Sequence, residues 1–202
     1  LEGVVNIVID NVSELVEKSD LSILFLVEEE AQELALKAVR GKAGQASVKS
    51  KKGDIFDLWV LKQRQPLLVS DADKDFRFNL ELIPEEFKRE FKSLITAPLI
   101  SNKKVIGIIR VESKETEAYM LDDLRLLTII SDLSAIAIEN AKLYHRIEEL
   151  AIRDGLTGLY CHRYFNERLA EDILKVTRIR QPLSLLMLEI EDFKGYNDKY
   201  GH

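Results

Sequence analysis

Residues 93–113, SLITAPLISNKKVIGIIRVES, consist of two apolar segments joined by a short polar link. The segments 94–100 and 104–113 are rich in isoleucine, leucine and valine, which is typical of β-strands. Asn102 lies in the link between them, and its short polar side chain tolerates the left-handed backbone of a tight turn. The stretch therefore predicts a β-hairpin.

The residues before this hairpin predict a leading helix and further strands. Hydrophobic residues recur at steps of three and four over residues 2–18, which indicates an amphipathic helix. Short apolar or alternating runs at 21–27, 33–39 and 66–71 predict three strands. Strands in close succession, with helices before and after them, predict an antiparallel sheet covered by helices on one face. The expected fold class is α+β.

A short helix is predicted between the second and third of these strands. Asp54 follows Gly53 and can cap a first helical turn, because its carboxylate accepts hydrogen bonds from free backbone N–H groups. We expect this helix to place Ile55, Leu58 and Trp59 on its apolar face.

A long helix is predicted after the hairpin, because residues 121–153 contain neither glycine nor proline. Its apolar row advances by alternating steps of three and four, which is a heptad repeat. The row consists of Leu126, Ile129, Leu133, Ile136, Asn140, Leu143, Ile147 and Leu150. A second row, Ile130, Ala137 and Tyr144, favours packing of the first half of the helix on its own sheet.

The second half of this helix predicts a parallel homodimer. Counting Leu126 as an a position places Asn140 at a as well, and a single asparagine at a specifies register and a two-stranded coiled coil. The expected dimer seam is Leu133, Ile136, Asn140, Leu143, Ile147 and Leu150. The alternative is that Asn140 faces solvent or its own sheet.

The residues after this helix contain two blocks that resemble the opening of a GGDEF domain, the diguanylate cyclase family. The blocks are RDGLTGLYCHRYF (153–165) and LSLLMLEIEDFKGYNDKYGH (183–202). The matching residues are Asp154, Leu156, Thr157, Gly158, Leu159, Arg163, Phe165, Phe193, Lys194, Asn197, Asp198, Gly201 and His202. A helix is predicted over 162–178, and the apolar run 183–190 predicts a strand buried on both faces. Asp192 is expected to cap a last helix.

The GGDEF resemblance implies a site for GTP and Mg²⁺ at the end of that strand. It implies Glu189 and Ile190 as metal ligands, with Glu191 as the next carboxylate, and Mg²⁺ prefers oxygen ligands. The residues that the resemblance places against GTP are Phe193, Lys194 and Asn197. In such a family two GTP molecules, one in each of two facing domains, are joined into cyclic di-GMP.

The chain departs from the family pattern at several positions. Glu189 and Glu191 stand where aspartate is usual, and Cys161 and His162 replace asparagine and arginine. The 202 residues contain no Gly-Gly-Asp/Glu-Glu-Phe turn, so we expect this chain alone to make no cyclic di-GMP and to bind no Mg²⁺. A catalytically inactive binding or dimerisation protein is therefore the alternative to a regulated cyclase.

The earlier residues resemble a GAF domain, a sensor fold built from an antiparallel sheet and helices. PLLVSD (66–71), the hairpin and the long helix support this resemblance. It implies a pocket for an unidentified small molecule, with candidates Phe76, Arg77, Phe78 and Phe87. A GAF domain that binds nothing and only dimerises is the other interpretation. We expect a GAF domain over 1–123, a signalling helix over 124–153 and the start of a GGDEF domain over 154–202.

Composition excludes several other classes of protein. The formal net charge of −6 argues against nucleic-acid binding. No run of about 18 apolar residues is present, so we expect no membrane-spanning segment. Cys161 is the single cysteine, which excludes an internal disulfide. A cytoplasmic location fits these features best.

Overall fold

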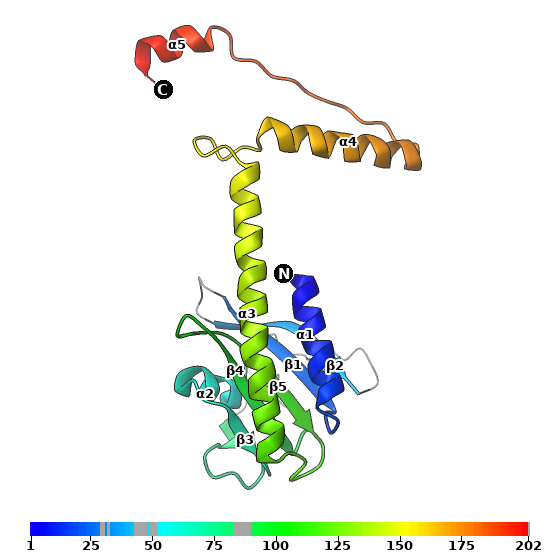
Figure 1. Ribbon diagram of the computed structural model, residues 1–202, viewed down its shortest axis with the longest axis vertical. Helices are drawn as coiled ribbons and strands as arrows, with labels where there is room; N and C mark the ends of the chain where they lie inside the picture. Colours follow the sequence, from blue (N-terminus) through cyan, green and yellow to red (C-terminus); the bar gives the residue numbers. More distant parts are fainter. Residues whose placement is uncertain (29–30, 32, 43–47, 49–51, 83–89, 202) are drawn as a thin grey trace. The chain divides into compact units, whose positions relative to one another are not determined.

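The computed structural model describes residues 1–28, 31, 33–42, 48, 52–82 and 90–201, apart from the side chains of 149–151. The chain divides into two compact units, Leu1–Arg146 and Ile147–His202, and each is described by itself. Figure 1 shows the elements of both units along the chain.

The first unit is built on a five-stranded sheet with the order β2-β1-β5-β4-β3, and every neighbouring pair is antiparallel. The strands are β1 (Leu21–Glu28), β2 (Glu33–Gly41), β3 (Leu67–Val69), β4 (Ser93–Ser101) and β5 (Lys104–Ser113). The antiparallel sheet predicted from the sequence is therefore confirmed.

The predicted hairpin is formed by β4 and β5. Ser101 pairs with Lys104, which leaves a two-residue turn between the strands. Asn102 has φ 49° and Lys103 has φ 64°, so both turn residues adopt the left-handed backbone. A two-residue turn of this kind matches the natural twist of paired strands.

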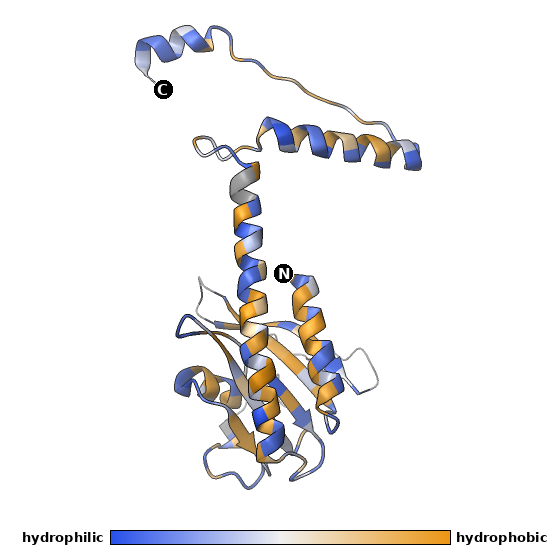
Figure 2. Cartoon of the chain, in the orientation of Figure 1, coloured by the Kyte–Doolittle hydropathy of each residue, from blue (hydrophilic) through white to orange (hydrophobic). Residues whose placement is uncertain are grey.

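Helices cover both faces of the sheet rather than one. α1 (Glu2–Leu15) and the first part of α3 (Leu121–Ile152) pack on one face, and α2 (Ile55–Gln63) packs on the other, as Figure 1 shows. The expectation of a single covered face was wrong because the inner strands are apolar on both sides. Seven consecutive residues of β4 are buried, and Figure 2 shows hydrophobic residues concentrated on the strands.

The short helix α2 has the expected cap but a different buried face. Asp54 accepts hydrogen bonds from the backbone N–H groups of Phe56 and Asp57, and Asp57 Oδ2 accepts one from Asp54 N–H, which completes a capping box. The helix buries Phe56, Asp57 and Val60, whereas Leu58 is 53% exposed. Of the predicted face, Ile55 and Trp59 pack partly against the core, and only Leu58 was wrong, because Asp57 turns inward toward a buried arginine.

Gly107 in β5 lies where two strands approach closely. A Cβ atom at this position would collide with the Phe25 carbonyl oxygen of β1 and would lie 2.8 Å from Leu26 Cδ2. Leu26 pairs with Gly107 in the sheet, so no side chain fits between the strands here.

The second unit contains α4 (His162–Ile179) and α5 (Phe193–Tyr200). The predicted strand over 183–190 is absent from the described residues: this segment is extended, exposed and unpaired. A strand requires a hydrogen-bonded neighbour, and the described part of the chain provides none for this segment. Asp192 occupies the N-cap position of α5, as predicted, but it has φ 51° and its side chain makes no capping hydrogen bond.

Candidate functional site

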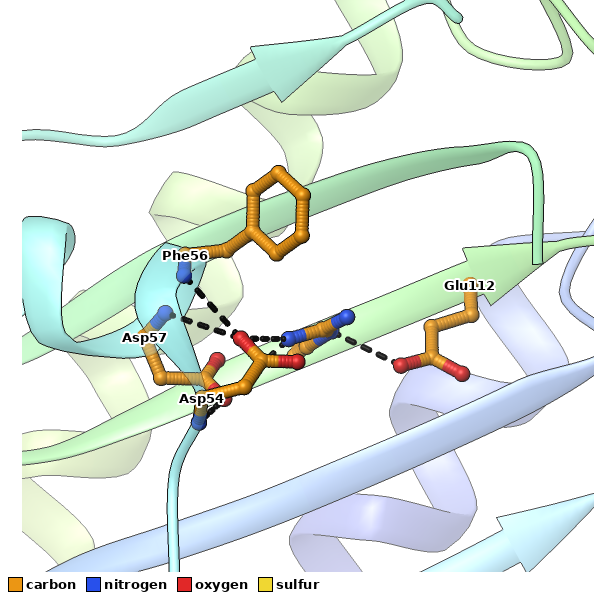
Figure 3. A network of polar contacts seen from close by, with 5 residues as sticks. Asp54, Phe56, Asp57 and Glu112 are labelled. Carbon is orange, nitrogen blue, oxygen red and sulfur yellow. Dashed lines mark hydrogen bonds and ion pairs between the residues drawn. The ribbon is translucent and has the colours of Figure 1, made fainter. Parts of the chain in front are cut away.

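The first unit encloses a buried cluster of charged side chains around Arg110 of β5 (Figure 3). Arg110 Nη1 lies 2.6 Å from Asp54 Oδ1 and 3.1 Å from Asp57 Oδ2. Arg110 Nε lies 2.8 Å from Glu112 Oε1, as an ion pair whose N–H is not aligned with the oxygen. The Arg110 side chain is fully buried, so the cluster links α2 to the centre of the sheet away from water.

Electrostatics keep Arg110 charged. Burial acts to lower its pKa, but the charges of Asp54, Asp57 and Glu112 outweigh burial and raise the pKa above the ordinary value. The guanidinium carbon also lies 5.3 Å from the ring centre of Phe56 and 4.8 Å from that of Phe91. Such cation–π contacts stabilise a desolvated arginine further.

This cluster was not predicted from the sequence. Its one visible sign was an arginine followed two residues later by a glutamate inside an apolar strand, because side chains at i and i+2 share a face. The Asp54 and Asp57 partners lie more than fifty residues earlier, and only the fold brings them to Arg110.

The candidate residues of the GAF pocket are only partly brought together. Phe76 is 97% exposed. Phe78 packs on Phe56, with ring centres 4.5 Å apart, and therefore joins the aromatic group beside Arg110. Phe87 lies outside the described residues.

Arg77, the polar pocket candidate, is held by its own loop. Its Nη2 donates to the Leu68 carbonyl at 2.7 Å and to Asp75 at 2.6 Å. The hydrogen bond from Arg77 holds the pKa of the Asp75 carboxyl below its ordinary value, although partial burial opposes the shift. Arg77 therefore has partners from the protein itself.

The heptad row of α3 is exposed in the first unit and at the start of the second. Exposed fractions range from 37% at Leu126 to 65% at Leu133. The other exposed apolar members are Ile129, Ile136, Leu143 and Ile147. Asn140 is exposed as well, and the Leu150 side chain lies outside the described residues. The row is thus an apolar stripe that the chain does not cover itself.

A different stripe of α3 packs on the sheet. Leu127, Ala135 and Ile138 are completely buried, and Ile130 packs partly against the same core. Ala137 and Tyr144 are exposed, so the expected second row was wrong beyond Ile130. Successive side chains of an α-helix are turned by about 100° around its axis. Positions 127, 135 and 138 therefore lie on the same, inner face.

The residues implied for GTP and Mg²⁺ lie in the second unit. Glu189 and Ile190 belong to the exposed extended segment, and Phe193, Lys194 and Asn197 lie in α5. The Glu189 carboxylate and the Ile190 carbonyl are oxygen donors of the type that Mg²⁺ accepts. The described residues contain no group of three His, Cys, Asp or Glu side chains that could hold a metal ion. Among them, the Glu189 carboxylate and the Ile190 carbonyl therefore do not make up a complete set of metal ligands. His202 lies outside the described residues.

A turn between α3 and α4 is well defined by hydrogen bonds. Asp154 Oδ1 accepts bonds from the Thr157 hydroxyl at 2.7 Å and from Thr157 N–H at 2.8 Å. The bond from the Thr157 side chain lowers the pKa of Asp154 below its ordinary value. Gly158 follows with φ 70°, which favours glycine.

The antiparallel sheet, with α1 and α3 on one face and α2 on the other, defines a sensor module of the GAF type. Residues 1–139 match the family described as GAF domain, and the chain belongs to this family. Residues 151–202 match the family described as diguanylate cyclase, GGDEF domain. The chain therefore joins a GAF domain to a GGDEF segment.

Two curated proteins are similar to this chain over part of their length. A protein of Bacillus subtilis named Uncharacterized protein YtrP is 30% identical over 115 residues, which are 57% of this chain and 19% of that protein. Diguanylate cyclase A of Treponema denticola is 31% identical over 110 residues, which are 52% of this chain and 29% of the relative. The chain thus spans less than a third of the length of these two relatives.

Solved structures show the same fold. The GAF domain of a two-component sensor histidine kinase from Bacillus halodurans is 26% identical, with a TM-score of 0.56, and the match covers 72% of this chain and 97% of that one. The GAF domain of an Acinetobacter phosphoenolpyruvate-protein phosphotransferase is 19% identical, with a TM-score of 0.55 over 68% of this chain and 81% of that one. Among the described residues, no helix has the length and apolar character needed to cross a membrane.

Proposed function

We propose that this chain is the sensory and connecting part of a diguanylate cyclase. The order of a GAF domain, the helix α3 and a GGDEF segment supports this proposal, together with the similarity to Diguanylate cyclase A. In this proposal the GAF domain senses a small molecule and thereby controls the joining of two GTP molecules into cyclic di-GMP. Because GTP is an intracellular nucleotide, the proposed location is the cytoplasm.

The observation that carries the proposed control is the exposed heptad row of α3. Six aliphatic side chains of this row are exposed on one helix, and burying a leucine or isoleucine is worth about 1.5–3 kcal/mol. A second copy of the chain, aligned in parallel, covers this row with the same row of its own helix. A parallel dimer also brings two GGDEF segments to the same end, as a reaction between two bound GTP molecules requires.

The GGDEF segment supplies the proposed nucleotide contacts. Glu189 and the Ile190 carbonyl would bind Mg²⁺, which neutralises phosphate charge when bound. Phe193 and Lys194, at the start of α5, would lie near the phosphates, because a helix N-terminus favours anions. Asn197 would contact guanine.

Replacing Asn140 tests the proposed dimer seam. Asn140→Leu should keep or raise the stability of the dimer, because it removes a buried amide, while it loosens register and oligomeric state. His145→Leu is the matched control, since His145 is exposed and occupies a heptad position away from the seam. Light scattering and cysteine crosslinking along α3 measure stoichiometry and register. If Asn140→Leu leaves both unchanged, Asn140 does not face its counterpart.

A fusion protein tests the regulatory role. Residues 1–153 are joined to the cyclase domain of an active relative, and cyclic di-GMP is measured by chromatography. Leu133→Glu should break the dimer and abolish most product formation, whereas His145→Glu should leave it unchanged. Equal activity of a monomeric Leu133→Glu fusion would refute control through α3.

A second candidate function is an inactive nucleotide-binding or dimerisation protein, and the glutamates at positions 189 and 191 favour it. Each glutamate is one methylene longer than the usual aspartate, which displaces a ligand oxygen. Glutamates are introduced at the two matching positions of an active relative, and cyclic di-GMP is measured. Loss of product with retained GTP binding would favour the second candidate, and retained turnover would favour the cyclase.

A further inference from the structure

A cavity of about 590 Å³ lies at one end of the sheet in the first unit, apart from the Arg110 cluster and the α3 row. Its apolar lining consists of Val27, Leu61, Val105 and Ile106. Its polar lining consists of Arg64, Lys104 and Lys142. The volume falls within the range of about 300–1,000 Å³ that is usual for small-molecule pockets.

The fold gathers these residues from four different elements. Val27 lies near the end of β1, Val105 lies near the start of β5, and Leu61 comes from the last turn of α2. Lys142 comes from α3, which packs on the opposite face of the sheet from α2. The cavity therefore lies around the end of the sheet and is reached from both helical layers.

Among the described residues that line the cavity, the charged ones are three cations and no carboxylate. Arg64, Lys104 and Lys142 form no ion pair with any carboxylate in the part of the chain that the structure describes. The whole chain has an excess of acids, with a formal net charge of −6, so a purely cationic lining is not a consequence of overall composition.

Two acidic side chains near these elements have partners elsewhere. Glu139 of α3 accepts a hydrogen bond from Asn102 Nδ2 at 3.2 Å. Glu28, next to Val27, pairs with Lys37 at 3.4 Å. Neither carboxylate forms an ion pair with Arg64, Lys104 or Lys142 in the described part of the chain.

The dipole of α2 explains only one of the three cations. Arg64 is the C-cap of α2, where a positive charge is favoured by the helix dipole. Lys104 begins β5 and Lys142 lies more than a turn before the end of α3, so neither is at a helix C-terminus. The helix dipole therefore does not explain the positions of Lys104 and Lys142.

We propose that this cavity binds a small phosphorylated organic molecule. Lysine ammonium groups and the planar guanidinium of arginine recognise phosphate oxygens, and the aliphatic lining accommodates an apolar portion of the ligand. The Arg64 backbone is left-handed, at φ 58°, and its Nη1 donates to the Lys103 carbonyl at 3.4 Å, which orients the guanidinium beside the hairpin. The proposal does not depend on cyclase activity.

The position of Lys142 gives the ligand a direct effect on α3. A phosphate held by Lys104 and Lys142 joins the β4–β5 hairpin to the helix, beside the existing Asn102–Glu139 hydrogen bond. Binding therefore restricts the motion of α3 by a direct contact near residues 139–142. The aromatic group beside Arg110 takes no part in this effect.

Titration with inorganic pyrophosphate tests the site. We expect saturable binding to the 202-residue chain with a Kd below about 1 mM, which calorimetry measures readily. Arg64→Gln and Lys142→Gln should each weaken binding by about tenfold or more, and Lys142→Arg should retain it. Binding should weaken as salt concentration rises, because the contacts are ionic. Hydrogen exchange at residues 102–106 and 139–143 should slow when pyrophosphate is added.

Two control variants separate this site from general surface charge. Arg125→Gln removes an exposed cation of α3 that does not line the cavity, and Lys175→Gln removes one from α4. Both should bind pyrophosphate normally, and circular dichroism confirms that all variants fold. The proposal is overturned if no saturable binding occurs, if Arg125→Gln or Lys175→Gln weakens binding as much as Lys142→Gln, or if pyrophosphate leaves exchange at residues 102–106 and 139–143 unchanged.

Discussion

Two segments of this chain have nearly the same composition and different structures. Residues 21–28 read LSILFLVE and residues 183–190 read LSLLMLEI, with the same residue at four of eight positions. The first is β1, in which Leu24 is completely buried between β2 and β5. The second forms no strand, and Leu186 is 81% exposed. An apolar run becomes a strand only where neighbouring strands accept its hydrogen bonds.

Hydrogen exchange should show the largest difference between the two segments. Amides of β1 open only with the whole GAF domain, whose unfolding free energy of about 5–15 kcal/mol corresponds to at least 10³-fold protection. Amides of 183–190 have no partners in the described chain and should exchange at close to the rate of an unfolded peptide. Equal protection of both segments in a monomer would contradict the prediction that only residues 21–28 form a paired strand.

Loss of the buried cation should produce the next largest effect. Arg110→Met leaves Asp54, Asp57 and Glu112 close together without their cation, and we expect a loss of about 3–5 kcal/mol in unfolding free energy. Urea unfolding followed by Trp59 fluorescence measures it. The control Arg125→Met removes an exposed pair and should change stability by less than about 1 kcal/mol. Similar values for both variants would contradict the importance of the cluster.

A matched pair of leucine replacements sharpens the comparison between the segments. Leu24→Ala should lower the unfolding free energy by about 2–5 kcal/mol, because it opens a cavity in a packed core. Leu186→Ala should change the same transition by less than about 0.5 kcal/mol, since its side chain is exposed. A cost of more than about 1 kcal/mol for Leu186→Ala would indicate that 183–190 packs on a partner in solution.

The smallest expected difference concerns two carboxyls of lowered pKa, Asp75 in the first unit and Asp154 in the second. A carboxyl whose pKa falls on folding adds stability above its unfolded pKa, and that stability is lost as the pH falls through the folded pKa. Asp75→Asn should therefore reduce GAF-domain stability at pH 7 by about 0.2–1 kcal/mol and leave it unchanged well below pH 3. Asp154→Asn should leave the GAF transition unchanged at every pH. Urea unfolding at several pH values measures both, and a shift caused by Asp154→Asn would show that the two units unfold together.

Local sequence patterns were sufficient to predict most of the fold. Asn102 predicted the hairpin because asparagine tolerates a left-handed backbone, and Asp54 predicted the start of α2 because its carboxylate can cap a helix. The heptad row of α3 predicted a stripe that the structure leaves exposed. Each of these features depends on residues close together in the chain.

Features that depend on distant partners could not be predicted. The inward turn of Asp57 depends on Arg110, which lies 53 residues later. The cationic cavity combines side chains of α2, β5 and α3, and its lysines look like ordinary surface residues in the sequence. The residues 183–190 were misassigned for the same reason, because their apolar pattern does not say whether a neighbouring strand is present.

Gly107 has a consequence for how this protein can diverge over evolutionary time. A larger residue at this position would collide with β1, so descendants that keep this close strand pairing must also keep the glycine. The cations Arg64 and Lys104 are exposed side chains, and substitutions there cost little folding energy. Descendants of this chain can therefore change the cations that border the cavity while the pairing of β1 with β5 beside it is kept. Ligand preference can then evolve by single substitutions without loss of the fold.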